Sequence, residues 1–148
     1  MNIDEIYVDP SALVGLYIHT PTSRALSAWR ARIGGAVPIT RFSYAELINA
    51  LALGQFRGSL TEADCVGAIE DTRVDLTLGR LRLIDLLWRT TLDRAVKISG
   101  KHVPTIGARA LDVLHIASAL ELGARQFVTY DERQARLAEA CRLKVVRP

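Results

Sequence analysis

Four carboxylates occupy positions in the sequence where a protein can do chemistry. Asp9 and Asp131 each follow directly after a short β-branched and aromatic run, and Glu46 and Asp112 lie inside apolar segments with helical character. If the four side chains converge, their mutual repulsion destabilises an empty site, and a hard divalent cation relieves it. Oxygen ligands without His or Cys favour Mg²⁺ or Mn²⁺ over zinc. The sequence therefore predicts a site suited to metal-assisted phosphodiester hydrolysis.

Each carboxylate also has a purely structural interpretation. Asp9 and Asp131 are suitable N-caps for the helices expected after them. The two acids inside helices have arginines nearby, Arg41 and Arg109, with which to form salt bridges, or they lie near a helix end that faces water. A lone ionised carboxylate in an apolar helix is costly unless it is paired or binds a metal. Both interpretations stay open at this point.

Three further side chains lie beside these acids. Ser11 and Thr129 carry hydroxyls that can orient a carboxylate or a metal-bound water, and that can equally satisfy backbone groups. His115 lies one helical turn beyond Asp112, where it can hydrogen-bond that carboxylate or take part in acid–base chemistry. A histidine packed in the core is the alternative.

Basic and aromatic residues provide candidates for contacts with a larger partner. Four arginines near the expected site can hold nucleic-acid phosphates, although a solvated surface arginine is the simpler interpretation of each. They are Arg41, Arg57, Arg109 and Arg133. Three aromatic residues can stack bases or form protein interfaces, with core packing as the alternative. They are Trp29, Phe56 and Trp88.

Strands and helices alternate along the chain, and this order positions the acids. Strands are expected over 6–8, 37–39, 81–84, 126–129 and 144–146. Helices are expected from residue 10 and over 22–33, 42–53, 62–75, 86–99, 109–122 and 132–140, with a loop over 100–107. The segment 42–53 is apolar nearly all round, which predicts a buried helix. Alternation of this kind implies an α/β fold whose parallel strands bring their carboxyl ends, with Asp9 and Asp131, to one edge.

Composition sets limits on the class of protein. The 148 residues suit one domain, 1–148, and 49% hydrophobic with 24% charged residues is typical of a folded globular chain. A net charge of +3 and a pI near 9.1 favour a polyanionic partner only weakly. Cys65 and Cys141 make neither a disulfide framework nor a zinc pattern and are expected as small buried hydrophobes. The acidic start and the interrupted apolar runs predict a cytoplasmic protein without a membrane span.

Four segments together resemble the motifs of the PIN-domain family. They are Ile6–Leu13, Ser43–Leu47, Leu111–Ala117 and Phe127–Asp131, and their order and spacing match over essentially the full chain. The most similar subgroup is the VapC toxins, small endoribonucleases. The resemblance implies an α/β/α sandwich around a central, mainly parallel sheet of four to five short strands.

The resemblance also implies an activity and partners. By analogy, Asp9, Glu46 and Asp112 bind one or two Mg²⁺ or Mn²⁺ ions, Asp131 completes the acidic pocket, and water attacks an RNA backbone. A homodimer and a VapB-like antitoxin that covers the pocket are implied as well. Pro10 stands where the family more often has Thr or Ser, and Ser11 can supply the hydroxyl instead.

Two other functions are compatible with parts of the sequence. Asp9 after the first strand suits a phosphoryl-transfer nucleophile, but Ser11 occupies the position of the expected second Asp. A non-catalytic PIN-fold module that binds RNA or a protein is the other alternative. The set of four acids favours the metal-dependent endoribonuclease, because a degenerate site has no reason to retain buried charge.

Overall fold

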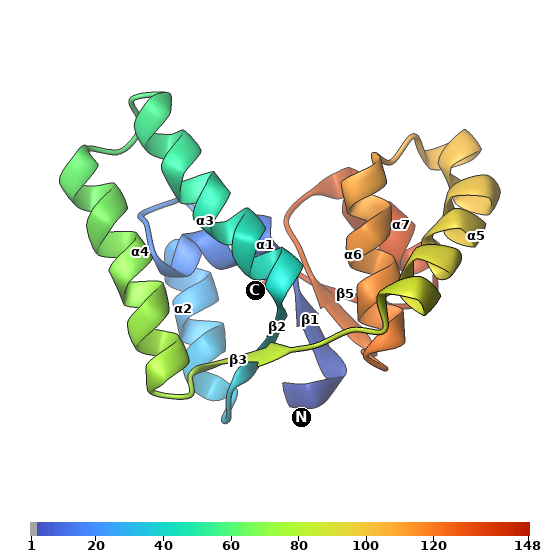
Figure 1. Ribbon diagram of the computed structural model, residues 1–148, viewed down its shortest axis with the longest axis horizontal. Coiled ribbons are helices and arrows are strands. Elements are labelled where there is room, and N and C mark those ends of the chain that lie inside the picture. Colours follow the sequence, from blue (N-terminus) through green and yellow to red (C-terminus); the bar gives the residue numbers. More distant parts are fainter. Residues whose placement is uncertain (1–2) are drawn as a thin grey trace.

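Five short strands, all parallel, run through the centre of the molecule, a computed structural model that describes residues 3–148 (Figure 1). They are β1 (Ile6–Val8), β2 (Val37–Thr40), β3 (Leu81–Ile84), β4 (Gln126–Val128) and β5 (Lys144–Val146). Hydrogen bonds join them in the order β1-β4-β5 in one sheet and β2-β3 in another. The expected α/β class with parallel strands is confirmed, and the division into two sheets was not predicted.

A proline explains why the two sheets do not join. The Val37 N–H donates to the Arg80 carbonyl at 2.8 Å, so Val37 directs its backbone groups toward β3, and Pro38, the next residue, faces β1. Pro38 has no N–H to donate, and for this reason proline is confined to unpaired strand edges. Within residues 3–148, β1 and β2 lie side by side without pairing. A cavity of about 270 Å³ lies at this seam between β1 and β2.

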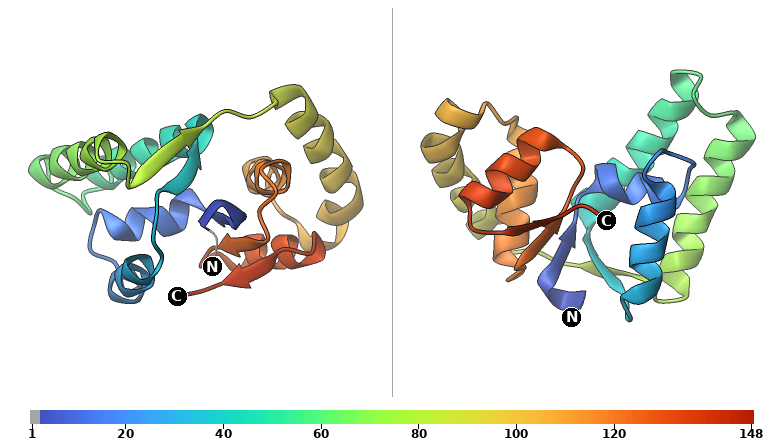
Figure 2. Two further views of the ribbon diagram at one scale, coloured as in Figure 1. Left: turned by 90° about the horizontal axis from the view of Figure 1, so that it is seen from below. Right: turned by 180° about the vertical axis from the view of Figure 1, so that it is seen from behind.

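Helices cover the strands from two sides (Figure 1). On one side are α1 (Pro10–Leu13), α2 (Ser23–Arg32), α3 (Arg41–Phe56) and α4 (Glu62–Thr77), with short 3₁₀ turns at Ile3–Glu5 and Val14–Leu16. On the other are α5 (Trp88–Ile106), α6 (Ala110–Glu121) and α7 (Glu132–Ala140), and Figure 2 shows the same division from below and from behind. No helix of residues 3–148 is both long and apolar enough to cross a membrane.

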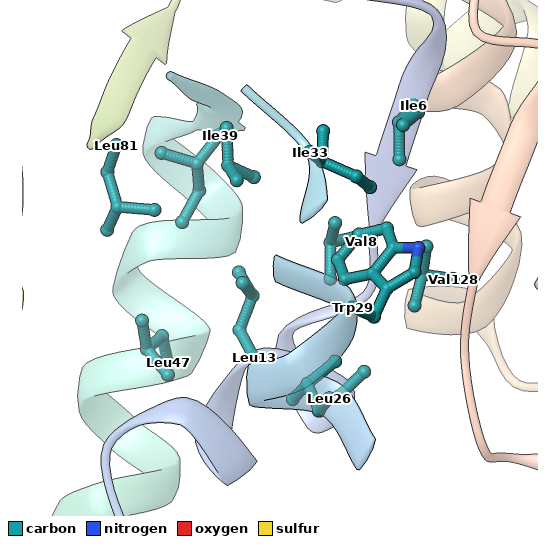
Figure 3. Packing of buried hydrophobic residues seen from close by; sticks show 12 residues of the cluster. Ile6, Val8, Leu13, Leu26, Trp29, Ile33, Ile39, Leu47, Leu81 and Val128 are labelled. Atoms are coloured by element: carbon teal, nitrogen blue, oxygen red, sulfur yellow. The ribbon is translucent and has the colours of Figure 1, made fainter. Parts of the chain in front are cut away.

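The strands separate two hydrophobic cores. Ile6 and Val8 of β1 enter a core shared with α1, α2, α3 and β2, and Tyr7 between them enters a second core with α5, α6 and α7. Figure 3 shows the first core, in which Val8, Trp29 and Val128 lie together. Since successive side chains of a strand point to opposite faces, β1 is buried on both faces, as a sandwich requires.

The expected loop over 100–107 is wrong. Helix α5 continues through Pro104 to Ile106. Val103 and Ile106 pack against the second core, and this burial outweighs the low helix propensity of proline in the last turns. The helix ends at Gly107, whose φ of 72° lies in the left-handed region that favours glycine.

Helix α3 is less buried than its sequence predicted. It continues past residue 53 to Phe56, and one face packs on α1 and α4 while other positions stay exposed. The fully buried residues of α3 are Ser43, Leu47 and Leu51. Gly54 allows the chain to turn back closely, because a Cβ there would lie 2.9 Å from Leu60 Cδ1.

Candidate active site

A pocket of about 450 Å³ lies at the carboxyl ends of β1 and β4 and is lined by residues of α3 and α6. All four carboxylates predicted from the sequence line it, from four different elements. The complete lining is Asp9, Ser11, Glu46, Arg109, Ala110, Leu111, Asp112, His115, Asp131 and Gln134. The expected convergence of the acids therefore occurs, while their catalytic role stays a prediction.

Asp9 is the most deeply buried of the four acids, at 4% exposed. It precedes α1, but its side chain makes no capping hydrogen bond. The Ser11 hydroxyl donates to its Oδ2. Burial raises the pKa of the Asp9 carboxyl, although Ser11, His115 and Gln134 act in the opposite direction. The N-cap interpretation of Asp9 is wrong, and the carboxylate is left free at the base of the pocket.

Asp131 does cap its helix. Its Oδ1 accepts the Gln134 N–H at 2.8 Å, and its own N–H donates to Thr129 Oγ1 at 3.1 Å. Asp131 is exposed, whereas Thr129 is fully buried and is absent from the pocket lining. Asp131 thus combines the structural role with a place in the pocket, and Thr129 satisfies a backbone amide.

Glu46 lies in the second turn of α3 and is held by a histidine. Its Oε2 contacts His115 Nε2, and His115 Nδ1 lies 2.8 Å from the Tyr7 hydroxyl. The Tyr7 hydroxyl is also 2.8 Å from Ser43 Oγ. His115 is 2% exposed, and its ring stacks on Phe42 with centroids 4.9 Å apart. The expected bond from His115 to Asp112 is not formed, because the imidazole faces Glu46 instead.

These contacts form one buried chain of hydrogen bonds, in which each hydroxyl donates to the next group along the chain. Thr40 Oγ1 donates to Ser43 Oγ at 2.9 Å, which leaves the Ser43 hydroxyl hydrogen for Tyr7. Burial raises the pKa of the Tyr7 phenol, so its hydroxyl stays protonated and donates to His115 Nδ1. An imidazole that accepts this hydrogen bond at Nδ1 carries a proton on Nε2, facing the Glu46 carboxylate. We call this chain, Thr40–Ser43–Tyr7–His115–Glu46, the relay.

Asp112 lies in the first turn of α6 and is half-buried. Its Oδ2 accepts the Arg109 N–H at 3.0 Å, so the helix-end interpretation holds for this residue. Arg41 pairs with Asp85 at 3.1 Å rather than with Glu46. Arg109 extends from the start of α6 at the edge of the pocket and is the one arginine of the predicted four that lines it.

The remaining candidates lie elsewhere. Arg57 and Arg133 are exposed and outside the pocket lining. Trp29 packs in the first core, as the simpler interpretation predicted, whereas Phe56 is 87% and Trp88 40% exposed. The cysteine prediction is confirmed for Cys65, which is buried, while Cys141 is only partly buried.

Sequence reasoning missed Tyr7, Ser43 and Gln134. A hydroxyl in the middle of the strand that leads to Asp9 was a usable signal for Tyr7. The spacing Asp131-x-x-Gln134 matches a capping box, in which the glutamine side chain returns to the N-cap amide. Here Thr129 already accepts that amide proton, and the Gln134 side chain lines the pocket instead.

The side chains present fit a hard divalent cation. The acids supply only oxygen ligands, and Asp9 forms no ion pair with Lys or Arg in residues 3–148. The imidazole of His115 is already committed on both nitrogens. Among the described residues, no three His, Cys, Asp or Glu side chains are already grouped closely enough to hold an ion. Binding of an ion would therefore require the carboxylates to move closer together.

Known proteins resemble this chain in sequence and in fold. The family model for the PIN domain matches residues 6–140. The chain is 28% identical over 147 residues to Ribonuclease VapC35 of Mycobacterium tuberculosis, in strains CDC 1551 / Oshkosh and ATCC 25618 / H37Rv, covering 97% of this chain and 96% of the relative. The crystal structure of FitAcB from Neisseria gonorrhoeae matches with a TM-score of 0.64 and 19% identity, over 97% of each chain. The last match supports the fold alone.

Proposed function

The chain belongs to the PIN-domain family, and from this premise we propose that it is an endoribonuclease that hydrolyses RNA with Mg²⁺ or Mn²⁺ held by Asp9, Glu46, Asp112 and Asp131. One observation carries the proposal. Four carboxylates, from the end of β1, from α3, from α6 and from the end of β4, line a single pocket, and the deepest of them makes no capping bond and, within residues 3–148, no ion pair with Lys or Arg. The name of the relative VapC35 as a ribonuclease supports RNA as the substrate.

The protein's own groups prepare the pocket for this role. Ser11 fixes one oxygen of Asp9, and His115 fixes one oxygen of Glu46, so the remaining lone pairs of both carboxylates are available. Arg109 places a positive charge at the rim, where an RNA phosphate can approach the acids. When bound, the cation lowers the pKa of a water and stabilises charge on the reacting phosphate.

We further propose that the protein is a cytoplasmic homodimer and the toxin half of a toxin–antitoxin pair, neutralised by a VapB-like antitoxin that covers the pocket. Exposed apolar side chains support the existence of protein interfaces, because a solvated monomer has little use for them. On α5 they include Trp88, Leu92 and Val96, and at the end of α3 Phe56. Copurification with the product of an adjacent gene, followed by light scattering of the free protein, tests both partners.

Cleavage of a mixed RNA pool tests the activity. The purified protein is incubated with Mg²⁺, with Mn²⁺ or with chelator, beside Asp9→Ala and Asp71→Ala prepared identically. Asp71 is an exposed acid on α4, outside the pocket, and serves as the matched control. Divalent-dependent cutting that is lost only in Asp9→Ala is expected.

Cutting at the wild-type rate by Asp9→Ala would refute the proposal. If all three proteins are silent, a thermal shift separates the explanations. Manganese should raise the melting temperature of the wild type above its value in chelator, because an ion that binds only the folded state stabilises it. No shift would favour a non-catalytic binding module.

A further inference from the structure

Gln134 carries a buried donor that the fold leaves unused. The residue lies in the first turn of α7, is 2% exposed, and lines the acidic pocket. Its Oε1 accepts a hydrogen bond from Thr129 Oγ1 at 3.3 Å. Its Nε2 makes no hydrogen bond, and among residues 3–148 it is the one buried side-chain nitrogen or oxygen without a partner.

Helix capping does not account for this side chain. The backbone N–H of Gln134 bonds Asp131 Oδ1, and the backbone N–H of Asp131 bonds Thr129 Oγ1. Both polar groups of the cap are therefore satisfied without the glutamine amide. An unsatisfied buried donor destabilises the folded protein, so the Gln134 amide is unfavourable at this position unless a ligand uses its N–H groups.

The bond to Thr129 fixes the orientation of the amide. With Oε1 directed to the Thr129 hydroxyl, Nε2 faces the pocket on the side of Asp9; the Gln134 side chain lowers the pKa of that carboxyl as a nearby donor does, although the two groups do not meet the geometry of a hydrogen bond. An amide nitrogen donates hydrogen bonds and cannot coordinate a cation. The natural ligand of Nε2 is therefore an oxygen that bears negative charge.

We propose that Gln134 is a substrate-binding residue that donates from Nε2 to a non-bridging oxygen of the RNA phosphodiester in the acidic pocket. The proposal rests on the proposed nuclease function. A cation held by the carboxylates would attract the phosphate, and Nε2 would supply a hydrogen-bond donor at the base of the same pocket. Arg109 at the rim adds a second donor group, exposed to solvent.

Two substitutions test the role of the amide. Gln134→Met keeps the length of the side chain and removes the donor, and Gln134→Glu replaces the donor by a like charge. Gln55→Met, at an exposed position on α3, is the matched control. Melting temperature and circular dichroism establish that each variant folds. We expect Gln134→Met to be as stable as the wild type, because an unsatisfied polar group is removed along with the weak bond to Thr129.

Binding is measured by fluorescence anisotropy of a fluorescein-labelled RNA oligonucleotide, with Ca²⁺ in place of Mg²⁺ and gels to verify intact RNA. A hydrogen bond to a charged oxygen predicts a loss of affinity of about tenfold or more in Gln134→Met. Gln134→Glu loses more, and Gln55→Met loses nothing. In cleavage assays KM rises by about the same factor with kcat nearly unchanged, the pattern of a lost substrate contact.

Manganese stabilisation without RNA is the decisive second readout. It stays at the wild-type value in Gln134→Met if the amide contacts RNA, and it falls if the amide only holds Asp9. Unchanged RNA affinity, or a fall in manganese response, overturns the inference. If RNA binding depends on Gln134 but the wild type does not cleave RNA in Mg²⁺, only the nuclease proposal is overturned. If the wild type binds no RNA, both proposals are overturned.

Discussion

Replacing Tyr7 by Phe removes one hydroxyl from the middle of the relay and leaves the ring in place. The ring stacks on Phe127 with centroids 5.3 Å apart, and this packing is retained. Ser43 keeps its bonds to Thr40, but its hydroxyl hydrogen loses its acceptor, and His115 Nδ1 loses its partner at 2.8 Å. Each buried group left without a partner costs about 1–3 kcal/mol, so the two together cost about 2–6 kcal/mol. At about 2–4 °C per kcal/mol for a chain of this size, the melting temperature falls by roughly 4–24 °C.

The substitution should also change the site that the relay supports. Without a donor at Nδ1, the imidazole no longer has a reason to keep its proton on Nε2, and the orientation of Glu46 is less well defined. Removal of a residue that hydrogen-bonds to a metal-binding side chain typically lowers metal affinity or activity by about 10–100-fold. We therefore expect weaker stabilisation by manganese and at least about tenfold slower RNA cleavage.

Urea denaturation in chelator measures the stability change, and ¹H–¹⁵N spectra of the imidazole rings report the tautomer of His115. Tyr17→Phe is the matched control, because Tyr17 donates to Asp75 Oδ2 at 2.9 Å on the opposite side of the seam from the relay histidine. It should lose comparable stability while the His115 spectrum and cleavage stay unchanged. If Tyr7→Phe behaves in every assay like Tyr17→Phe, the relay contributes packing alone and the reasoning is refuted.

Three further substitutions follow from the structure. In chelator, Asp9→Asn should stabilise the protein by on the order of 1–2 kcal/mol at pH 7 by urea denaturation, because an uncompensated buried charge is removed. Burial raises the pKa of Asp9 above its value in the unfolded chain. The gain in free energy of unfolding of the variant over the wild type should therefore shrink as the pH falls, because the wild-type carboxyl takes up its proton. A gain that grows toward low pH would contradict a raised pKa. Gly107→Ala forces a Cβ into the left-handed region and should cost about 1 kcal/mol, whereas Gly100→Ala, inside α5 with open space at its Cβ, should gain about 0.5–1 kcal/mol. Equal signs for the two glycines in the same denaturation assay would contradict the observed end of α5.

The sequence predicted the strands and most helix ends because those signals are local. Thr61 caps α4 through a capping box with Asp64, so the expected start at residue 62 is confirmed, and Gly123, with a positive φ, follows α6 close to its expected end at residue 122. The end of α5 was missed because contacts with a distant core decide it, and local propensity at Pro104 points the other way.

The two acids that follow strands show the same limit at the site. Asp9 and Asp131 stand in similar sequence contexts, yet only Asp131 caps its helix. At α1 the Asp9 carbonyl already accepts the Ala12 N–H at 2.9 Å, the donor that a side-chain cap would use. The Asp9 carboxylate is therefore free for other contacts. The position of Asp9 and Asp131 at one edge was predictable from parallel strands, and the place of Glu46 and Asp112 beside them was implied by the family resemblance. The relay, which joins Tyr7 to a histidine 108 residues away, required the three-dimensional structure.

The seam between β1 and β2 has no backbone hydrogen bonds between the two strands in the described part of the chain, and side-chain packing and the relay cross it instead. Glu46 stands on α3, which follows β2, and the other three acids belong to elements beyond the seam. Since α3 shares the first core with β1 and α1, an ion that draws Glu46 toward the other acids would have to move α3 against close-packed side chains, while both strand ladders could stay intact.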